Sequence, residues 1–310
     1  YIESILGDKD ESAKVIFKDD GMVDILVGTQ SNGQGHETVF AQFLSDQTGI
    51  PADHIRVVQG DSDLIARGGG TGGSRSGTVQ ANATLQTVAV MQKAFRAFLS
   101  DKLDVDADQI VFDDERFRAP GSNLSPTFLE VADMARAAGR EDLMQHSAYA
   151  VLDSRSFPNG AHICEVEIDP DTGAVEVARY SVVDDFGNLL NPMLVEGQVH
   201  GGVAQGIGQA ISEHVVYDDQ GQLLSASFMD YAVPRAKDVP FYQFETEPLP
   251  TTTNVMGMKG CGEAGTVGAL AAVSNAVHDA LSCRGVRQLD MPFTPLRVWE
   301  ALNQADVAAE

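Results

Sequence analysis

The most glycine-dense stretch of the chain, residues 68–77, carries Ser74, Arg75 and Ser76 directly before a long helical pattern. Glycines allow backbone N–H groups to turn toward a ligand, and the start of a helix favours negative charge. The serine hydroxyls and the arginine would add hydrogen-bond donors and a fixed cation. The stretch therefore predicts a phosphate or pyrophosphate cradle, with a flexible loop before a helix as the alternative. It has neither the Gly-Lys-Ser/Thr of a Walker A loop nor the spacing of a Rossmann fingerprint.

A second glycine turn, Gly33-Gln34-Gly35, lies between a strand pattern and a helix pattern. Glycines on both sides of Gln34 would let a flat ligand approach closely, and the amide can donate and accept hydrogen bonds together. The alternative is a capped turn without a ligand. His36 follows, and no second candidate ligand stands four residues later. We therefore interpret His36 as a solvated or core histidine rather than a metal ligand.

Residues 196–210 form a helical pattern that contains five glycines. Glycine inside a helix costs about 1 kcal/mol relative to alanine, so a repeated cost needs a reason. One reason is a ligand faced by Gln198, Gln205 and Gln209. Close packing of the helix against another backbone explains the glycines equally well.

Glu263 follows Gly262 and stands at the start of another helical pattern. The helix dipole favours an ionised carboxylate there, which suits a base that accepts a proton. The alternative is ordinary charge compensation at a helix N-terminus. Cys261 could be a nucleophile, but the sequence places no histidine to activate it, so a small buried side chain is the favoured interpretation.

Composition narrows the class of protein. The chain has 310 residues and a formal net charge of −24, which argues against nucleic acid and anionic membrane surfaces as partners. No apolar run approaches the roughly 20 residues that cross a bilayer. The chain begins at Tyr1 without a signal-peptide pattern, as a piece of a longer chain would. Its three cysteines form no CxxC pair, so we expect no zinc or iron–sulfur site within it and a reducing, cytoplasmic location.

The pattern of elements predicts an α+β fold: two α/β lobes of mixed sheets packed with helices, each lobe running from strands through a glycine-rich loop to a helix. We expect a first lobe over 1–110, an acidic linking segment with a helix over 111–155, and a second lobe over 156–310. The predicted strands are 13–18, 22–27, 55–59, 163–168, 174–180, 181–186, a hairpin over 214–224, and 241–246. The predicted helices are 37–47, 78–100, an alanine-rich one between Pro126 and Gly139, 194–212 and 266–282.

Five segments in this order resemble the molybdenum hydroxylases, a family that includes xanthine dehydrogenases, aldehyde oxidases, aerobic carbon monoxide dehydrogenases and bacterial N-heterocycle hydroxylases. The resemblance covers nearly the whole chain. Each segment alone is a weak to moderate signal, and the five together are a strong one. They are TQSNGQGHETVFAQ, GGTGGSRSG, FPNGAHICEVEIDPDTG, VEGQVHGGVAQGIGQA and MKGCGEAGTVGALAAVSNAVHDAL.

The resemblance implies a role for each candidate residue. Gln34, between Gly33 and Gly35, would bond the pyranopterin, and Gln205 would lie near the pterin and the metal. Glu263, after Gly262, would be the base beside molybdenum. The loop cradling the cofactor phosphate or dinucleotide would comprise Gly73, Ser74, Arg75 and Ser76. Molybdenum would be held by the dithiolene of molybdopterin, in the cytosine dinucleotide form, and not by protein ligands.

The family activity implied is hydroxylation of an aldehyde or N-heterocycle carbon of a small molecule with water-derived oxygen. Electrons would pass to iron–sulfur and FAD centres in partner chains. The family's large subunit is at least about twice this length, so the resemblance also implies an N-terminal half as a partner and little activity without it. Two alternatives stay open: a non-catalytic nucleotide- or phosphate-binding module, which the glycine loops alone would suit, and a structural partner subunit, which the missing N-terminal half would suit.

Overall fold

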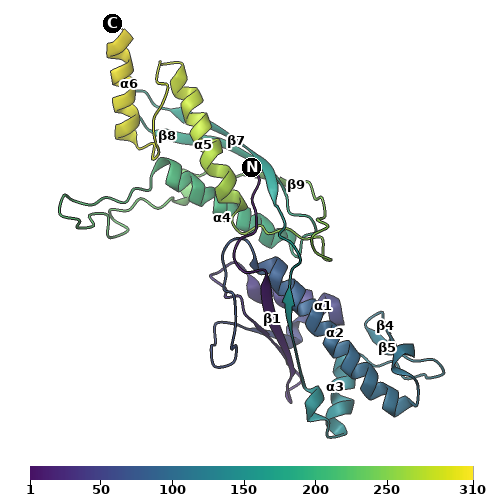
Figure 1. Cartoon of the computed structure of the whole chain (residues 1–310). Helices are drawn as coiled ribbons and strands as arrows, with labels where there is room; N and C mark the ends of the chain where they lie inside the picture. The colour runs from purple at the N-terminus through teal and green to yellow at the C-terminus, as the bar shows by residue number, and fades with distance from the viewer. Residues whose placement is uncertain (310) are drawn as a thin grey trace. The chain divides into compact units, whose positions relative to one another are not determined.

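A computed structural model describes residues 1–309 of the chain, with side chains as far as residue 304. Its contacts divide the chain into two compact units, and Figure 1 labels most of their helices and strands. Unit 1 consists of Tyr1–Ser4, Phe157–Pro250 and the chain from Lys259 onward, and unit 2 of Ile5–Ser156 and Thr251–Met258.

Unit 2 is built on a four-stranded sheet. Strand β1 pairs antiparallel with both β2 and β6, and β2 pairs parallel with β3. Because side chains alternate along a strand, β1 buries Glu11, Ala13, Val15 and Phe17 on one face. A carboxylate thus shares the inner face with apolar side chains. In sheet order the strands are β3 (Ile55–Val58), β2 (Val23–Val27), β1 (Asp10–Phe17) and β6 (Gln145–Val151).

The helices of unit 2 pack their apolar residues into one core with this sheet. The longest helix places Val88, Met91 and Phe95 in that core, at the helical spacing that the sequence predicts. The third helix begins with a capping box in which Thr127 and Glu130 bond each other's backbone N–H groups. The helices are α1 (His36–Thr48), α2 (Ser76–Leu103) and α3 (Phe128–Ala137), with short 3-10 turns at Ala52–His54, Ala107–Gln109 and Glu141–Leu143.

Residues 111–155, which we expected to link two lobes, contribute a substantial part of unit 2. They form the hairpin of β4 (Val111–Asp113) and β5 (Arg116–Arg118), then α3 and β6. Strand β6 completes the sheet beside β1, so this segment is part of a core and not a spacer. The mixed polar composition of β6 hides it in the sequence, since only two of its seven residues are buried.

Unit 1 packs helices against a three-stranded sheet in the order β7-β8-β9. Strand β8 is one continuous strand where the sequence indicates two, and it pairs antiparallel with β7 and parallel with β9. The hairpin expected over 214–224 is reduced to a single bridge between Tyr217 and Leu223. The elements are β7 (Asn159–Ile168), β8 (Val175–Asp185), α4 (Pro192–Ile211), a 3-10 turn at Ala236–Asp238, β9 (Gln243–Thr246), α5 (Ala264–Ser282) and α6 (Pro295–Ala309).

Helices α4 and α5 approach each other at glycines. A Cβ added to Gly202 would lie 2.9 Å from the backbone nitrogen of Thr266, and one added to Gly265 would lie 2.5 Å from the carbonyl oxygen of Val199. A Cβ at Gly206 would meet that of Ala269 at 2.5 Å. A Cβ at Gly208 would lie 2.5 Å from Pro234 Cγ, so close packing accounts for three of the five glycines in α4. At Gly197 and Gly201, by contrast, an added Cβ would meet nothing within 4 Å.

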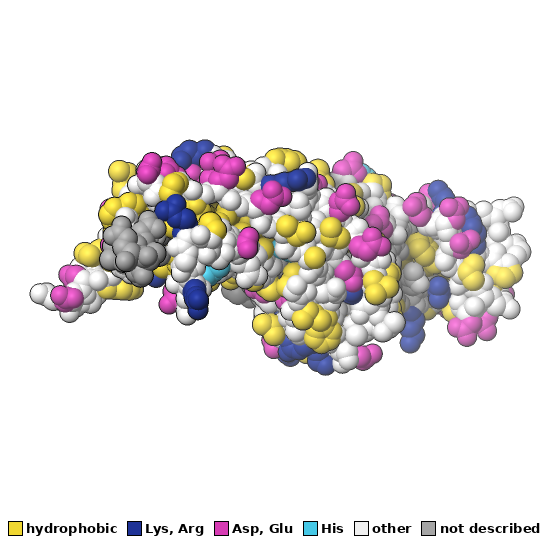
Figure 2. Space-filling view, turned by 90° about the horizontal axis from the view of Figure 1, so that it is seen from above, with side chains coloured by type: hydrophobic (Ala, Val, Ile, Leu, Met, Phe, Trp, Pro, Cys, Tyr) yellow, Lys and Arg dark blue, Asp and Glu magenta, His cyan; other side chains and the backbone are white. Residues whose placement is uncertain are grey.

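Over the face that Figure 2 shows, acidic side chains are dispersed among hydrophobic and basic ones. The net charge of −24 is therefore spread over this surface and is not gathered in an acidic tail. Among the described residues, no helix combines the length and apolar character that crossing a membrane requires.

Candidate functional site

In unit 2 the structure brings the Gly33–Gly35 turn and the 68–77 loop together. Both contact the carbonyl oxygen of Gln30, which accepts a hydrogen bond from Thr71 Oγ1 at 2.6 Å and one from Gln34 Nε2 at 3.4 Å. Gln34 Oε1 also accepts a hydrogen bond from the N–H of Asn32, so the side chain closes its own turn. Two segments about forty residues apart in the sequence thus form one glycine-rich surface.

The 68–77 loop reaches helix α2 through an unusual turn. Gly73 and Ser74 both have positive φ, 62° and 55°, a conformation that is costly for serine. Ser76 begins α2, and its hydroxyl bonds that of Thr71 at 3.2 Å. The first N–H groups of a helix have no partner within the helix, so the start of this 28-residue helix directs donors outward beside these hydroxyls.

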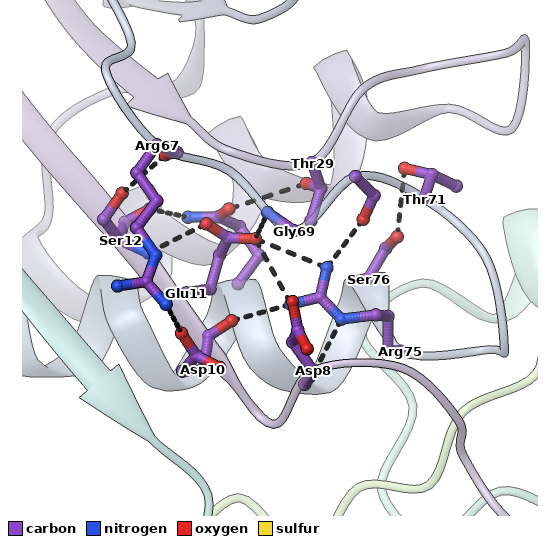
Figure 3. Close-up of polar contacts among 12 residues, drawn as sticks. Asp8, Asp10, Glu11, Ser12, Thr29, Arg67, Gly69, Thr71, Arg75 and Ser76 are labelled. Atoms are coloured by element: carbon purple, nitrogen blue, oxygen red, sulfur yellow. Dashed lines mark hydrogen bonds and ion pairs between the residues drawn. The ribbon is translucent and has the colours of Figure 1, made fainter.

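Arg75, by contrast, turns inward. Its guanidinium is 2% exposed and donates to the carbonyl oxygens of Asp8 at 2.8 Å, Asp10 at 2.7 Å and Gly70 at 2.6 Å. Both terminal nitrogens also lie 3.3 Å from Glu11 Oε2, on the inner face of β1. Figure 3 shows the guanidinium pointing toward Glu11 while Thr71 and Ser76 lie on its other side. The cation that the sequence offers for an anion is engaged within the protein.

In unit 1 the structure brings Gln205 and Glu263 to the same end of the α4–α5 contact. Glu263 is exposed, follows the exposed Gly262 and occupies the position directly before α5, as the sequence predicts. Its carboxylate does not cap the helix. Three residues later Thr266 Oγ1 donates to Gln205 Oε1 at 3.2 Å and to the carbonyl oxygen of Gly202 at 2.9 Å. The glutamine on α4 is thereby fixed relative to the start of α5.

A buried ion pair stabilises the base of the loop that carries Glu263. Lys259 donates to Asp185 at the end of β8, and the two side chains are 9% and 12% exposed. Desolvation alone would raise the pKa of Asp185, but the hydrogen bonds from Lys259 and from the N–H groups of Leu249 and Gly187 outweigh it, so the pKa is lowered. The Lys259 N–H also donates to the carbonyl oxygen of Phe186 at 2.8 Å. The loop therefore starts from a fixed point.

Two side chains that the sequence left ambiguous belong to the interior. His36 is buried, lies 4.7 Å from the ring of Phe40, and has its pKa lowered by desolvation. Burial, with the carboxylates of Glu3 and Asp184 nearby, raises the pKa of the Cys261 thiol to about 12, so it is protonated at neutral pH. His36 is therefore a core residue, and Cys261 is a partly buried side chain that packs against the core of unit 1.

Four side chains that shape these surfaces escaped the sequence analysis: Glu11, Asp185, Lys259 and Thr266. One signal was available for Glu11. Glu11 lies an even number of residues before Val15 and Phe17, so it points to the same buried face of the strand. A carboxylate on that face requires a buried partner. Lys259 and Thr266 stand inside the quoted glycine segment, but their partners are distant in sequence and no local pattern identifies them.

Comparison with known proteins gives three concordant matches. Residues 1–240 match the family described as molybdopterin cofactor-binding domain. The chain is 34% identical over 300 residues to the carbon monoxide dehydrogenase large chain of Afipia carboxidovorans, covering 95% of this chain and 37% of that protein. It is 35% identical over 300 residues to the nicotine 6-hydroxylase large subunit of Paenarthrobacter nicotinovorans, covering 94% and 36%.

A solved structure of carbon monoxide dehydrogenase from Oligotropha carboxidovorans aligns with a TM-score of 0.89 at 32% identity, covering 99% of this chain and 40% of that one. The α+β fold of helices and mixed sheets is therefore confirmed. The chain spans 36–37% of the length of the two curated relatives.

Proposed function

The chain belongs to the family of molybdopterin cofactor-binding domains, and on that premise we propose that it is the cofactor-binding part of a molybdenum hydroxylase in which Glu263 is the catalytic base. The substrate class is an aldehyde or N-heterocycle, and the oxygen added to carbon comes from water. The 35% identity to a nicotine 6-hydroxylase large subunit supports the heterocycle class. The observation that carries the proposal is the placement of Glu263 directly before α5, the helix whose Thr266 bonds Gln205 of α4.

The residues of unit 2 fit an anionic pterin cofactor. An added Cβ would meet nothing within 4 Å at Gly33, Gly70 or Gly72, so the backbone is open to a ligand at these points. The backbone N–H groups at the start of α2 supply hydrogen-bond donors of the kind that bind phosphate, and the hydroxyls of Thr71 and Ser76, which bond Gln30 and each other, fix the loop beside them. We assign the cofactor as the cytosine dinucleotide form of molybdopterin, whose second phosphate would use this loop, while Gln34 bonds the pterin.

When bound, molybdenum on its dithiolene would supply the two-electron oxidation that no protein side chain provides. The chain's own contribution is proton transfer and orientation. The Glu263 carboxylate accepts the proton that water-derived oxygen must lose, and Gln205, held by Thr266, orients the cofactor by hydrogen bonds. The pair Lys259–Asp185 keeps the loop of the base in place.

The remaining parts of the enzyme lie outside this sequence in our proposal. The N-terminal part of the large chain completes the substrate pocket, and iron–sulfur and flavin subunits carry electrons away. The share of the relatives' length that this chain covers, 36–37%, supports the first of these.

Replacing Glu263 by Gln in the complete enzyme tests the proposal. The amide keeps the size of the side chain but cannot accept the proton, so hydroxylation per molybdenum should fall about 10²- to 10⁴-fold. Molybdenum and pterin content should stay at the unmodified level. The matched control is Glu165→Gln, which alters an exposed carboxylate on β7 of the same unit and should leave the rate unchanged.

Two results would contradict the proposal. A near-normal rate in the Glu263→Gln enzyme with molybdenum retained would remove the base assignment. An unmodified complex without pterin, but with tight binding of free nucleotides, would favour a nucleotide-binding module instead.

A further inference from the structure

Two glycines of unit 2 lie where Glu11 and Arg75 leave no room for a larger residue. A Cβ at Gly28, the residue after β2, would lie 2.1 Å from Glu11 Oε1. A Cβ at Gly69 would lie 2.6 Å from Arg75 Nη2. Gly68 packs on Gly28 in turn, since its Cβ would lie 2.2 Å from the Gly28 carbonyl oxygen. The first part of the 68–77 loop is therefore shaped to fit around this ion pair.

Glu11 is bonded to the loop at two places. Its Oε2 accepts a hydrogen bond from the Gly69 N–H at 2.9 Å and lies 3.3 Å from both terminal nitrogens of Arg75. Arg75 in turn bonds the same part of the loop, because it donates to the Gly70 carbonyl oxygen. The Glu11 side chain is 1% exposed, so these bonds form away from water, where a charge without its partner is costly. One carboxylate on β1 thus holds both the start and the end of the loop.

We propose that Glu11 is a positioning residue for the anion-binding loop 68–77. By keeping Arg75 inside the unit, it makes the loop offer the backbone N–H groups at the start of α2 to the cofactor phosphate, while the hydroxyls of Thr71 and Ser76 stay bonded within the unit. The inference rests on the proposed function. Arg75 then acts through the shape of the loop, and the phosphate is held by neutral donors instead of a side-chain cation.

The test uses Glu11→Gln in the complete enzyme, with two readouts. Amide hydrogen exchange at residues 69–75 should become faster, while exchange at 260–266 of unit 1 stays unchanged. On dilution the cofactor should dissociate about tenfold faster, the scale on which a supporting partner of a ligand site acts. Activity per molybdenum still bound should equal that of the unmodified enzyme, because Glu11 does not touch the reacting atoms. The matched control, Asp24→Asn, removes a carboxylate that pairs with Arg56 on the neighbouring strand and should leave the loop and the cofactor unaffected.

A double variant separates positioning from stability. Glu11→Gln leaves Arg75 buried without an anion and should lower the melting temperature. Adding Arg75→Gln removes the uncompensated charge, so the melting temperature should recover at least in part. Cofactor dissociation should stay fast, because the two glutamines do not restore the hydrogen bonds by which Glu11 and Arg75 hold Gly69 and Gly70.

Recovery of cofactor retention together with stability in the double variant would overturn the proposal, and so would unchanged loop exchange in Glu11→Gln. An unmodified complex that contains no pterin would instead refute the proposed function. The exchange experiment would still decide whether Glu11 holds the loop.

Discussion

Lys259 and Arg75 are both cations that stand in glycine-rich segments and point into the protein. Lys259 is 9% exposed beside Asp185, and Arg75 is 2% exposed beside Glu11. In each unit a carboxylate from a strand binds a basic side chain of a loop. The glycines make each loop pliable, and the ion pair restricts it to one path. In each loop, the ion pair therefore determines where the candidate ligand-binding groups on its outer side lie.

Asp185→Asn should destabilise unit 1. The change leaves Lys259 nearly buried without its anion, and breaking one partner of a buried pair costs about 3–5 kcal/mol. Because the pKa of Asp185 is lowered in the folded state, its contribution is present above the ordinary pKa of an aspartate and is lost as the pH falls through the lowered folded-state value. Denaturant unfolding at pH 7 measures the loss. Asp238→Asn, which removes an exposed partner of Lys237, is the control and should change stability by no more than about 0.5 kcal/mol. Equal losses in the two variants would show that the buried pair is unimportant.

At the scale of elements, the contact between α4 and α5 determines where Gln205 and Glu263 lie. The two helices touch backbone to backbone at Gly202 and Gly265, which brings the start of α5 within hydrogen-bonding distance of α4. Glycine lowers the intrinsic stability of a helix, but here it lets the two backbones approach closely and fixes the distance between the helices.

Gly202→Ala and its neighbour Gly201→Ala form a matched pair. The new methyl at 202 would lie 2.9 Å from the Thr266 nitrogen, so the helices must separate, at a cost of about 1–3 kcal/mol. The displacement of Glu263 should reduce turnover per molybdenum. At 201 the methyl meets nothing within 4 Å, and alanine should raise the stability of the unit by about 1 kcal/mol. Thermal unfolding and single-turnover rates measure both effects. A harmless Gly202→Ala would show that the close approach does not position the base.

How far the sequence predicts these elements depends on local signals. Helices α1, α2, α4 and α5 follow glycine turns or caps and carry helix-spaced apolar residues, and all four lie where the sequence predicts them. Strand β6 was missed because its burial arises from partners distant in sequence: it pairs with β1, more than 120 residues earlier, and packs against α2. Helix α6 was missed although Pro295 at its first position is a readable start signal. Among the candidate site residues, Glu263 is predicted from its local setting alone, while Glu11 depends on a partner 64 residues away.

At the scale of the whole molecule, the histidines buried in unit 2 should make that unit sensitive to acid. His36 and His146 are buried in unit 2, and desolvation lowers the pKa of both. The ring of His146 lies 5.4 Å from that of Phe95, and the hydrogen bond with the Leu143 carbonyl oxygen and the nearby Asp142 offset the lowering of its pKa only in part. The family predicted from the five ordered segments is confirmed, but this sensitivity is a property of the packing in this chain.

Unit 2 should lose stability as the pH falls below about 6.5, the ordinary pKa of histidine. The unfolded chain then binds protons that the folded unit excludes, so acidification favours unfolding. His146→Gln should make this loss shallower between pH 6.5 and 5, whatever its effect at pH 7. Hydrogen exchange of the core of unit 2 against pH measures the slope for both proteins. An unchanged slope would mean that His146 is protonated without penalty in the folded state.

The division of the chain into units has a consequence for synthesis. The polypeptide passes from one unit to the other four times, and Thr251–Met258 returns to unit 2 after nearly a hundred residues of unit 1 have been made. Met256, in that returning stretch, packs on Ile5, Val79 and Leu152. On the ribosome, unit 2 therefore stays unfinished until residue 258 has emerged. Nascent chains halted before residue 251 should accordingly remain open to proteases and chaperones at both units.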